Sequence, residues 1–253
     1  MFNYIKSEFY RNIHVKGSTI ILFVTIGFVL LSNIFLSSYG GYGNTKTVFA
    51  EFGRSMGIPM ILCLPLVSII NGNEFKNRTL KNSISYGISR SQIYLGKFIV
   101  EVSISIIILI CITAVYIISG YILLENSGTM YLNDLLTAIV ACVPLFIVGI
   151  ACAHCLYFIC DNGTVVGLVW IAIMAVIPQG LSIVGSKFNI VKKISDYIPW
   201  NMFDVQGYDE SIDRIFMFWS SQEGFIKCFV VGIIGSIIFY MIGLTLFKKK
   251  EIK

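Results

Sequence analysis

Long apolar runs, separated by short polar segments, recur along the whole chain. A helix of about 20 apolar residues crosses roughly 30 Å of hydrocarbon. The 253 residues are 56% hydrophobic and only 13% charged, whereas ordinary soluble domains are about 25% charged. We therefore expect an all-α membrane protein with six transmembrane helices. The predicted spans are 18–36, 48–70, 98–124, 135–158, 165–184 and 225–247.

The segments outside the spans give the domain organisation. Residues 1–17 place Phe2, Ile5, Phe9 and Ile13 along one helical face, which predicts an amphipathic helix lying in the membrane interface. We assign 1–17 to this N-terminal helix, 18–247 to a six-span transmembrane domain, and 248–253 to a basic tail. The transmembrane domain includes two longer polar segments, 71–97 and 186–224.

Segment 71–97 carries one acid, Glu74, and five cations, which are Lys76, Arg78, Lys81, Arg90 and Lys97. Short loops rich in Lys and Arg stay on the cytoplasmic side of a membrane. The same rule applies to the lysines at 248–250. We therefore expect segment 71–97 and both chain termini to face the cytoplasm.

The residues of segment 71–97 also predict local structure. Asn73 can cap a helix that has Glu74 in its first turn, which is favourable at the positive end of a helix dipole. Leu80, Ile84 and Ile88 give that helix an apolar stripe. Tyr86-Gly87 interrupts it, and the Ser89…Gln92 spacing predicts a capping box for the next helix. Such a stripe favours a docking surface over an ordinary loop.

Several spans carry residues that disturb a helix or begin one. Pro59 and Pro65 are expected to kink the second span, near whose outer end Glu51 and Arg54 have the spacing of an ion pair. We expect Asn133-Asp134 to cap the fourth span. We expect a tight turn at 161–164 and a break in the fifth span at 178–180.

Segment 186–224 combines acids with many aromatic residues, a composition typical of membrane interfaces. We predict a short interfacial or re-entrant helix ending before Pro199, followed by an outer cap. Its residues fit an ordered loop at the headgroups at least as well as a ligand site. Candidate contacts for a transported molecule are Trp200, Asp204, Asp209, Glu210 and Asp213.

Few groups within the spans are reactive. Glu101 lies in the first turns of the third span, where either an interfacial structural role or a coupling role fits a costly intramembrane carboxylate. Cys152, His154, Cys155 and Cys160 lie close in sequence, yet helical spacing turns His154 away from the first two cysteines. Because a closed zinc site needs four converging ligands, apolar packing is the preferred interpretation.

The sequence contains no phosphate-binding loop and no His-Glu-x-x-His motif. It shows no interleaving of aromatic and basic residues that would suggest nucleic-acid binding. We therefore expect neither enzymatic activity nor a cofactor or metal in this chain. Its energy source should lie in a partner protein.

Taken together, these features resemble the permease subunit of type-2 ATP-binding-cassette transporters, particularly bacterial exporters of peptides or bacteriocin-immunity transporters. The resemblance rests on the N-terminal helix, the basic segment after span two, the broken segment between spans five and six, and the basic tail. The Glu74…Thr79…Ser89-Arg90…Lys97 series is its most specific part. Arg78 departs from the pattern, because a glycine often precedes the threonine.

The resemblance implies that 1–17 is an elbow helix and that Asn73–Ser85 is a coupling helix docked on a separate ATPase. The implied docking residues are Glu74, Phe75, Lys76, Arg78, Thr79, Leu80, Lys81, Ile84 and Arg90. It also implies a bacterial plasma-membrane complex of two permease chains, identical or paralogous, with two ATPase subunits that bind ATP and Mg. A secondary carrier or channel not powered by ATP is the alternative.

Overall fold

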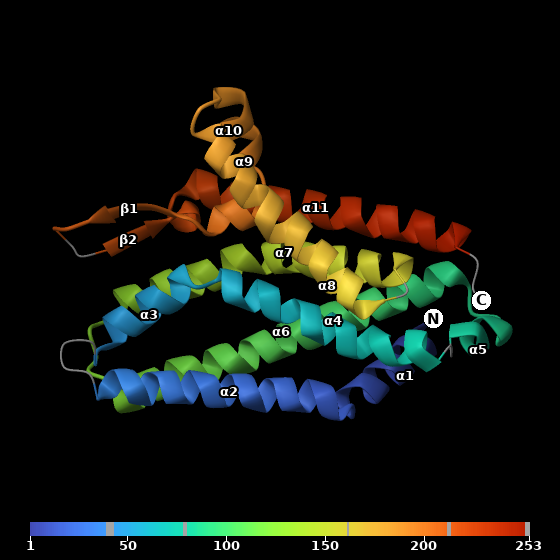
Figure 1. Ribbon diagram of the computed structural model, residues 1–253. Helices are drawn as coiled ribbons and strands as arrows, with labels where there is room; N and C mark the ends of the chain where they lie inside the picture. The colour runs from blue at the N-terminus through green and yellow to red at the C-terminus, as the bar shows by residue number, and fades with distance from the viewer. Residues whose placement is uncertain (39–42, 78–79, 161, 212–213, 251–253) are drawn as a thin grey trace.

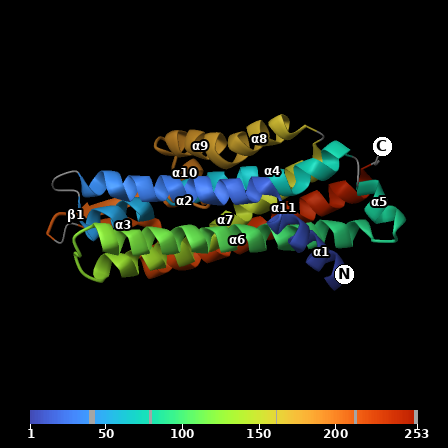
Figure 2. The ribbon, with the colours of Figure 1, turned by 90° about the horizontal axis from the view of Figure 1, so that it is seen from below.

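In the computed structural model, long helices lie lengthwise beside one another, as two perpendicular views show (Figures 1 and 2). The structure describes residues 1–38, 43–77, 80–160, 162–211 and 214–250. For residues 73–77 and 80–82 it describes the backbone only. Both chain termini and α5 (Leu80–Ser85) lie at one end, which we call the terminal end. The opposite end carries the hairpin of β1 (Val205–Asp209) and β2 (Arg214–Met217), and we call it the hairpin end.

Among the described residues, five helical stretches are long and apolar enough to cross a membrane. They are α2 (Lys16–Ser37), α6 (Arg90–Leu123), α7 (Met130–Ile159), the stretch Gly163–Gly185, and α11 (Gln222–Lys249). A sixth is obtained if α3 (Thr45–Arg54) and the Gly57–Gly72 part of α4 (Gly57–Asn77), which are bent by 58°, count as one span. The predicted all-α membrane fold is thus confirmed at this level, apart from the unpredicted hairpin.

Helix α7 forms the centre of the bundle. In its most apolar window 67% of residues are buried, against 39% in α6 and 11% in both α2 and α11. Helix α11 packs along it, and α3, α4 and α8 (Gly163–Ile171) also contact it. Small buried residues along α7, such as Ala141, Gly149 and Ala153, let neighbouring backbones approach, as is typical of helices packed within membranes.

The second predicted span bends at residues 55–56. The amide of Ser55 closes the last turn of α3 on Glu51, and Pro59 lies in the first turn of α4. Proline is tolerated there because the first helical amides have no intrahelical acceptor. Pro65 lies inside α4, which remains helical through it, and the kink predicted at that residue stays a prediction.

The fifth predicted span is not broken at residues 178–180. Helix α8 continues through a π-helical stretch, η1 (Ala172–Val176), into α9 (Ile177–Gly185). Pro178 lies in the first turn of α9. A π-helical turn changes the hydrogen-bond register, which is one way to place a proline without ending a helix.

The starts of the fifth and fourth spans are set by different contacts. Asn162 caps α8, with its side-chain oxygen accepting from the amide of Thr164. The predicted cap at Asn133-Asp134 is wrong, because α7 already begins at Met130 and Asp134 lies within it. The Asp134 carboxylate instead binds the guanidinium of Arg214 on β2. A distant partner has therefore replaced the local capping role.

Segment 186–224 folds into short elements. Helix α10 (Asn189–Ser195) ends before Pro199, as predicted, and projects from the bundle beside α9 (Figure 1). Two 3₁₀ turns, η2 (Pro199–Phe203) and η3 (Phe218–Ser220), flank the antiparallel hairpin. In the hairpin Asp209 pairs with Arg214 and Val205 with Met217, with an irregularity between Val205 and Gly207.

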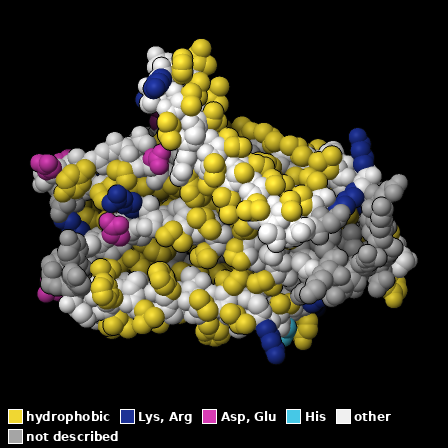
Figure 3. Space-filling view, viewed as in Figure 1, with side chains coloured by type: hydrophobic (Ala, Val, Ile, Leu, Met, Phe, Trp, Pro, Cys, Tyr) yellow, Lys and Arg dark blue, Asp and Glu magenta, His cyan; other side chains and the backbone are white. Residues whose placement is uncertain are grey.

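The surface follows the same division. Hydrophobic side chains cover the middle of the face in Figure 3, and charged side chains gather toward the two ends and on the projecting α9–α10 segment. The N-terminal helix α1 (Phe2–Ile13) is shorter than the predicted 1–17. Ile5 and Phe9 pack against the core, whereas Phe2 and Ile13 are exposed.

Candidate functional site at the terminal end of the bundle

The chain leaves the bundle through α4 and returns through α5 and α6. Helix α4 extends without interruption to Asn77, so Asn73 lies inside it and the predicted helix start there is wrong. The second half of the predicted helix corresponds to α5. The turn predicted at Tyr86-Gly87 is confirmed, with Gly87 at φ 84°, a conformation that glycine adopts without steric cost.

The start of α6 also follows its sequence. Ser89 accepts a hydrogen bond from the amide of Gln92, and the Gln92 side chain accepts one from the amide of Ser89. This is the predicted capping box, which satisfies two amides that the helix leaves unpaired. It fixes the direction in which α6 re-enters the bundle.

The apolar side chains of the connection that the structure describes face the bundle. Ile84 and Ile88 pack against a buried cluster that joins α6, α7 and α11. The cluster consists of Ile93, Tyr94, Phe158 and Phe247. The hydrophobic effect therefore attaches α5 and the following turn to the ends of these three helices.

The predicted docking residues are placed to different degrees. The backbone of Glu74, Phe75 and Lys76 lies in the last turns of α4, and that of Leu80 and Lys81 in α5. Arg78 and Thr79 lie outside the described residues. Of the two whose side chains are described, Ile84 packs on the cluster and Arg90 binds another helix.

Arg90, the first residue of α6, lies against the end of α11. Its Nη1 is 3.1 Å from the carbonyl oxygen of Phe247, 2.9 Å from that of Lys248 and 2.6 Å from that of Lys250. The guanidinium also lies 5.9 Å from the centre of the Phe247 ring. The first turn of α6 is thus joined directly to the last turn of α11.

A buried polar junction lies deeper in the bundle, between α4, α6 and α7. His154 Nδ1 is 2.8 and 2.9 Å from the two oxygens of Glu101, and both side chains are fully buried. Asn71 donates to the same carboxylate at 2.7 Å and to the carbonyl of Val67 at 3.2 Å. Because burying charged or polar groups is costly unless they are paired, these bonds hold the three helices in register.

Aromatic rings surround this junction. Tyr94 and Phe158 lie 4.3 and 4.7 Å from the His154 ring, centre to centre, and Phe98 lies at 5.4 Å. Among the described buried polar atoms, His154 Nε2, Asn71 Oδ1 and Tyr94 Oη have no hydrogen-bond partner. The junction is therefore polar at its centre and enclosed by apolar groups.

A buried ion pair attaches the N-terminal helix to α6. Lys97 is fully buried, and its Nζ lies 3.2 Å from a carboxylate oxygen of Glu8, which Arg11 contacts at 2.6 Å. Glu8 and Asn12 are buried on the face of α1 that meets the bundle. Polar as well as apolar residues therefore hold α1 in place, contrary to the simple apolar face expected from the sequence.

Sequence reasoning identified Glu101 but missed its partners. The sequence pattern groups His154 only with neighbouring cysteines, and it marks Asn71 only as the start of a polar segment. One signal was available, because a carboxylate within a span requires a partner on another span. His154 is the only histidine within a predicted span, so it was the natural choice.

The cysteines form no cluster that competes for His154. All seven are free thiols, and five of them, including Cys152 and Cys155, are buried. Within the described part of the chain, no group of three or more His, Cys, Asp or Glu side chains could hold a metal ion. The apolar packing role preferred for Cys152 and Cys155 agrees with this arrangement.

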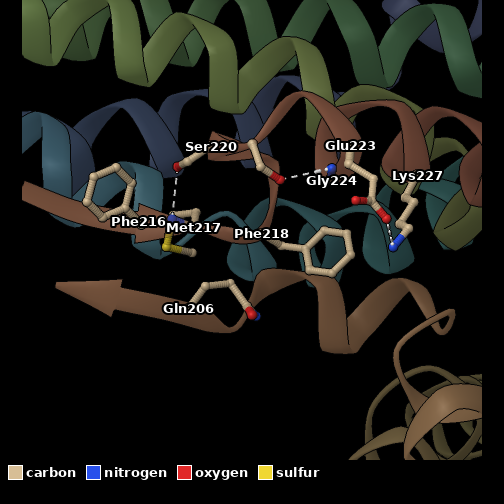
Figure 4. A pocket seen from close by; sticks show the side chains of 9 residues that line it. Gln206, Phe216, Met217, Phe218, Ser220, Glu223, Gly224 and Lys227 are labelled. Atoms are coloured by element: carbon tan, nitrogen blue, oxygen red, sulfur yellow. Dashed lines mark hydrogen bonds and ion pairs between the residues drawn. The ribbon is translucent and has the colours of Figure 1, made fainter.

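The hairpin end contains a separate pocket of about 430 Å³ (Figure 4). Phe216, Met217 and Phe218 line it together with polar side chains of Gln206 and the first turns of α11. Glu223 and Lys227 form an ion pair at 2.6 Å along its rim. An aromatic wall facing a charged rim suits an amphipathic molecule.

The predicted transport contacts lie near this pocket in sequence but, where described, do not line it. Trp200 packs against the core, and the Asp209 carboxylate accepts hydrogen bonds from the amide and hydroxyl of Ser211. Asp204 and Glu210 are exposed, and Asp213 lies outside the described residues. Partial burial raises the pKa of the Asp204 carboxyl above its ordinary value.

The terminal end therefore joins a helical connection to the bundle through an apolar cluster, a cation at a helix end, the buried Glu101–His154 hydrogen bonds and the buried Glu8–Lys97 ion pair. Such an arrangement can transmit a force applied to the connection. Comparison with curated proteins found no match. A family model described as "ABC-2 family transporter protein" matches residues 4–179. This match covers the N-terminal helix, the α4–α5–α6 connection and α7. The chain belongs to the ABC-2 family of transporter proteins.

Proposed function

We propose that this permease subunit exports an amphipathic or antimicrobial peptide, or a similar hydrophobic molecule. Its membership of the ABC-2 family makes it a multi-pass transport subunit that associates with an ABC ATPase, and ATP hydrolysis takes place in other chains. In our proposal the α4–α5–α6 connection sits in a groove of that ATPase. ATP and Mg bind there, in the partner.

The observation that carries the proposal is how the connection joins the bundle. A span, α4, runs directly into it, and α5 packs on the cluster shared by α6, α7 and α11. A displacement of the connection would therefore reach three spans through packed side chains. Interiors packed in this way transmit displacement because they have few voids and low compressibility.

The charge distribution supports a cytoplasmic position for the terminal end. The segment between spans two and three carries Lys76, Arg78, Lys81 and Arg90, and Lys248–Lys250 follow the last span. Short cationic segments remain on the cytoplasmic side of a membrane. Both termini would then face the cytoplasm. The hairpin end would lie outside the cell, in agreement with the outer cap predicted for segment 186–224.

We propose an assembly of two permease chains, identical or paralogous, and two ATPase subunits in a bacterial plasma membrane. ATP would drive export by binding more tightly to one of two conformations of this assembly, because a ligand shifts an equilibrium only through such a difference in affinity. The connection described above would couple that preference to the bundle.

The docking proposal is tested by co-purifying the permease with its ATPase. Glu74→Lys and Leu80→Asp should each abolish the complex, because the first reverses a charge and the second adds one at predicted docking residues. Glu51→Lys is the matched control, since Glu51 is exposed at the hairpin end and pairs only with Arg54 in the described interactions. Unchanged complex formation and transport in both docking variants would refute the proposal.

The identity of the exported molecule has its own test. An amphipathic cation leaving the membrane would meet exposed carboxylates at the hairpin end, including Asp204 and Glu210. Neutralising Asp204, Asp209, Glu210 and Asp213 together should lower the tolerance of cells to such peptides. Equal tolerance at normal expression would exclude this role. Neutralising Lys187, Lys192 and Lys193 provides a control in the same segment.

The buried Glu101–His154 pair favours one alternative, a secondary carrier. Ionisable residues buried in membrane spans often mark proton or ion pathways. Uptake driven by an ion gradient in liposomes that contain this chain alone would support the carrier. Transport that requires the ATPase and ATP would support the exporter.

A further inference from the structure

The last turn of α11 is held by a cation from another helix. One guanidinium nitrogen of Arg90 lies within 3.1 Å of three successive or nearly successive carbonyl oxygens, those of Phe247, Lys248 and Lys250. The last four carbonyls of a helix have no amide donor within that helix. Arg90 therefore supplies donors that the end of α11 needs.

The electrostatics of the two helices explain the direction of this contact. A cation at the N-terminus of a helix is unfavourable, whereas a cation at a C-terminus is favourable. Arg90 is the first residue of α6, the unfavourable end of its own helix. It extends to the favourable end of α11, so the contact between helices compensates for its position.

A second cation continues the same arrangement. Lys250, the residue that ends α11, places its Nζ 3.0 Å from the carbonyl oxygen of Ile159, the last residue of α7. Phe247 packs between Tyr94 of α6 and Phe158 of α7, with the Phe158 ring 4.6 Å away. The starts or ends of three spans are thus joined by two cations and one aromatic cluster.

We propose that Arg90 is a positioning residue that attaches α11 to the α4–α5–α6 connection, with Lys250 extending the attachment to α7. The connection then moves α11 as well as α6 when the ATPase moves it. This inference rests on the proposed function. It assigns Arg90 a role within the permease rather than the docking role that the sequence pattern implied.

Arg90→Ala distinguishes the two roles. A positioning role predicts that the ATPase still co-purifies and still hydrolyses ATP, while transport falls about 5- to 150-fold, the usual range for coupling between two sites. Arg90→Lys should retain part of the transport, because a lysine keeps the charge without the planar fork. Arg54→Ala removes an exposed arginine at the hairpin end and should leave transport unchanged.

Hydrogen exchange provides a readout that does not depend on transport. In the permease alone, Arg90→Ala should speed exchange of amides in the last turn of α11, including that of Lys250, which bonds to Leu246. Amides in the middle of α11 should keep their protection. Lys250→Ala should likewise speed amide exchange at the end of α7, where the amide of Cys160 bonds to the carbonyl of Leu156.

Three results would overturn the inference. Loss of the ATPase complex in Arg90→Ala would make Arg90 a docking residue. Unchanged transport would remove the coupling role, and unchanged exchange at the end of α11 would remove the attachment. Failure of the wild-type chain to bind any ATPase would instead overturn the proposed function, and the exchange result would still decide whether Arg90 holds α11.

Discussion

The two ends of the bundle use charge in opposite ways. At the terminal end Glu101, His154 and Lys97 are fully buried, and each pairs with a residue on another helix. At the hairpin end, Arg214 and Asp134 retain 30% and 37% exposure, and Arg54 and Glu51 retain 55% and 53%. The same kinds of ion pair are therefore made in very different surroundings.

This difference indicates where the molecule is held in one arrangement. A buried pair loses much when one partner is removed, because the remaining group stays unpaired in an apolar environment. An exposed pair loses little, because water replaces the partner. The terminal end should therefore keep its helices in fixed register, whereas the hairpin end can change its charged contacts at small cost.

The largest effect is expected at the Glu101 junction. Glu101→Ala removes the carboxylate bound by His154 Nδ1 and one of the two acceptors of Asn71 Nδ2. Removing one partner of a buried pair costs about 3–5 kcal/mol. Glu101→Gln keeps one acceptor oxygen and should cost less. The free energy of unfolding of both variants can be measured in detergent by titration with a denaturing surfactant.

A double substitution sharpens this prediction. Replacing both partners by apolar groups of similar size is often nearly neutral. Glu101→Met with His154→Leu should therefore be more stable than Glu101→Ala alone. If Glu101→Ala unfolds at the same surfactant concentration as the wild type, the junction does not hold the helices, and the contrast between the two ends fails.

A second, smaller effect concerns helix packing near the junction. A side chain added at Gly243 of α11 would meet the Tyr94 hydroxyl and come within 2.9 Å of the Cys155 backbone. Gly243→Ala should therefore destabilise by about 1–3 kcal/mol, as overpacking does. Gly27→Ala in α2 is the control, because nothing lies within 4 Å of the added carbon.

The control should change stability in the opposite direction. Alanine in a helix interior is favoured over glycine by about 0.5–1 kcal/mol where no clash occurs. Unfolding of the two variants under the same conditions separates packing from helix propensity. Equal stabilisation in both would show that α11 can move away from α6 and α7, contrary to a fixed terminal end.

The sequence predicts the spans well because each depends on local hydropathy. It also predicts the Ser89–Gln92 capping box and the Glu51–Arg54 pair, which are both formed by residues three positions apart. It misplaces the starts at Asn73 and Asp134. In both cases the helix extends beyond the polar residue that was expected to begin it.

The candidate site was harder to predict, because its partners are far apart in sequence. Glu101 and His154 are separated by 53 residues, and Arg90 and Lys250 by 160. Hydropathy alone does not specify which faces of two spans meet. The hairpin was missed for a related reason, since its strands of five and four residues are too short to give a clear alternating pattern.

A moderate effect is expected at the pair formed by Arg214 and Asp134. The guanidinium binds the carboxylate through two nitrogens, and it joins β2 to the start of α7. Partial exposure limits the loss in Asp134→Asn to about 1 kcal/mol. Hydrogen exchange of the hairpin amides should rise in this variant, while the junction at Glu101 keeps its protection. Protection lost at both places would contradict independent ends.

The smallest effect is expected at Glu51 and Arg54, one turn apart on α3. Their closest atoms are 3.7 Å apart and both side chains are largely exposed. Such a pair contributes about 0.2–1 kcal/mol at low salt, and less as salt screens it. The free energy of unfolding of Arg54→Ala should therefore be close to that of the wild type, and raising the salt concentration should remove the remaining difference.

The loss of stability in Glu101→Ala should persist in the same salt series, because a buried pair is screened much less. Equal salt dependence in the two variants would mean that water reaches Glu101, and the distinction between the two ends would then have no electrostatic basis.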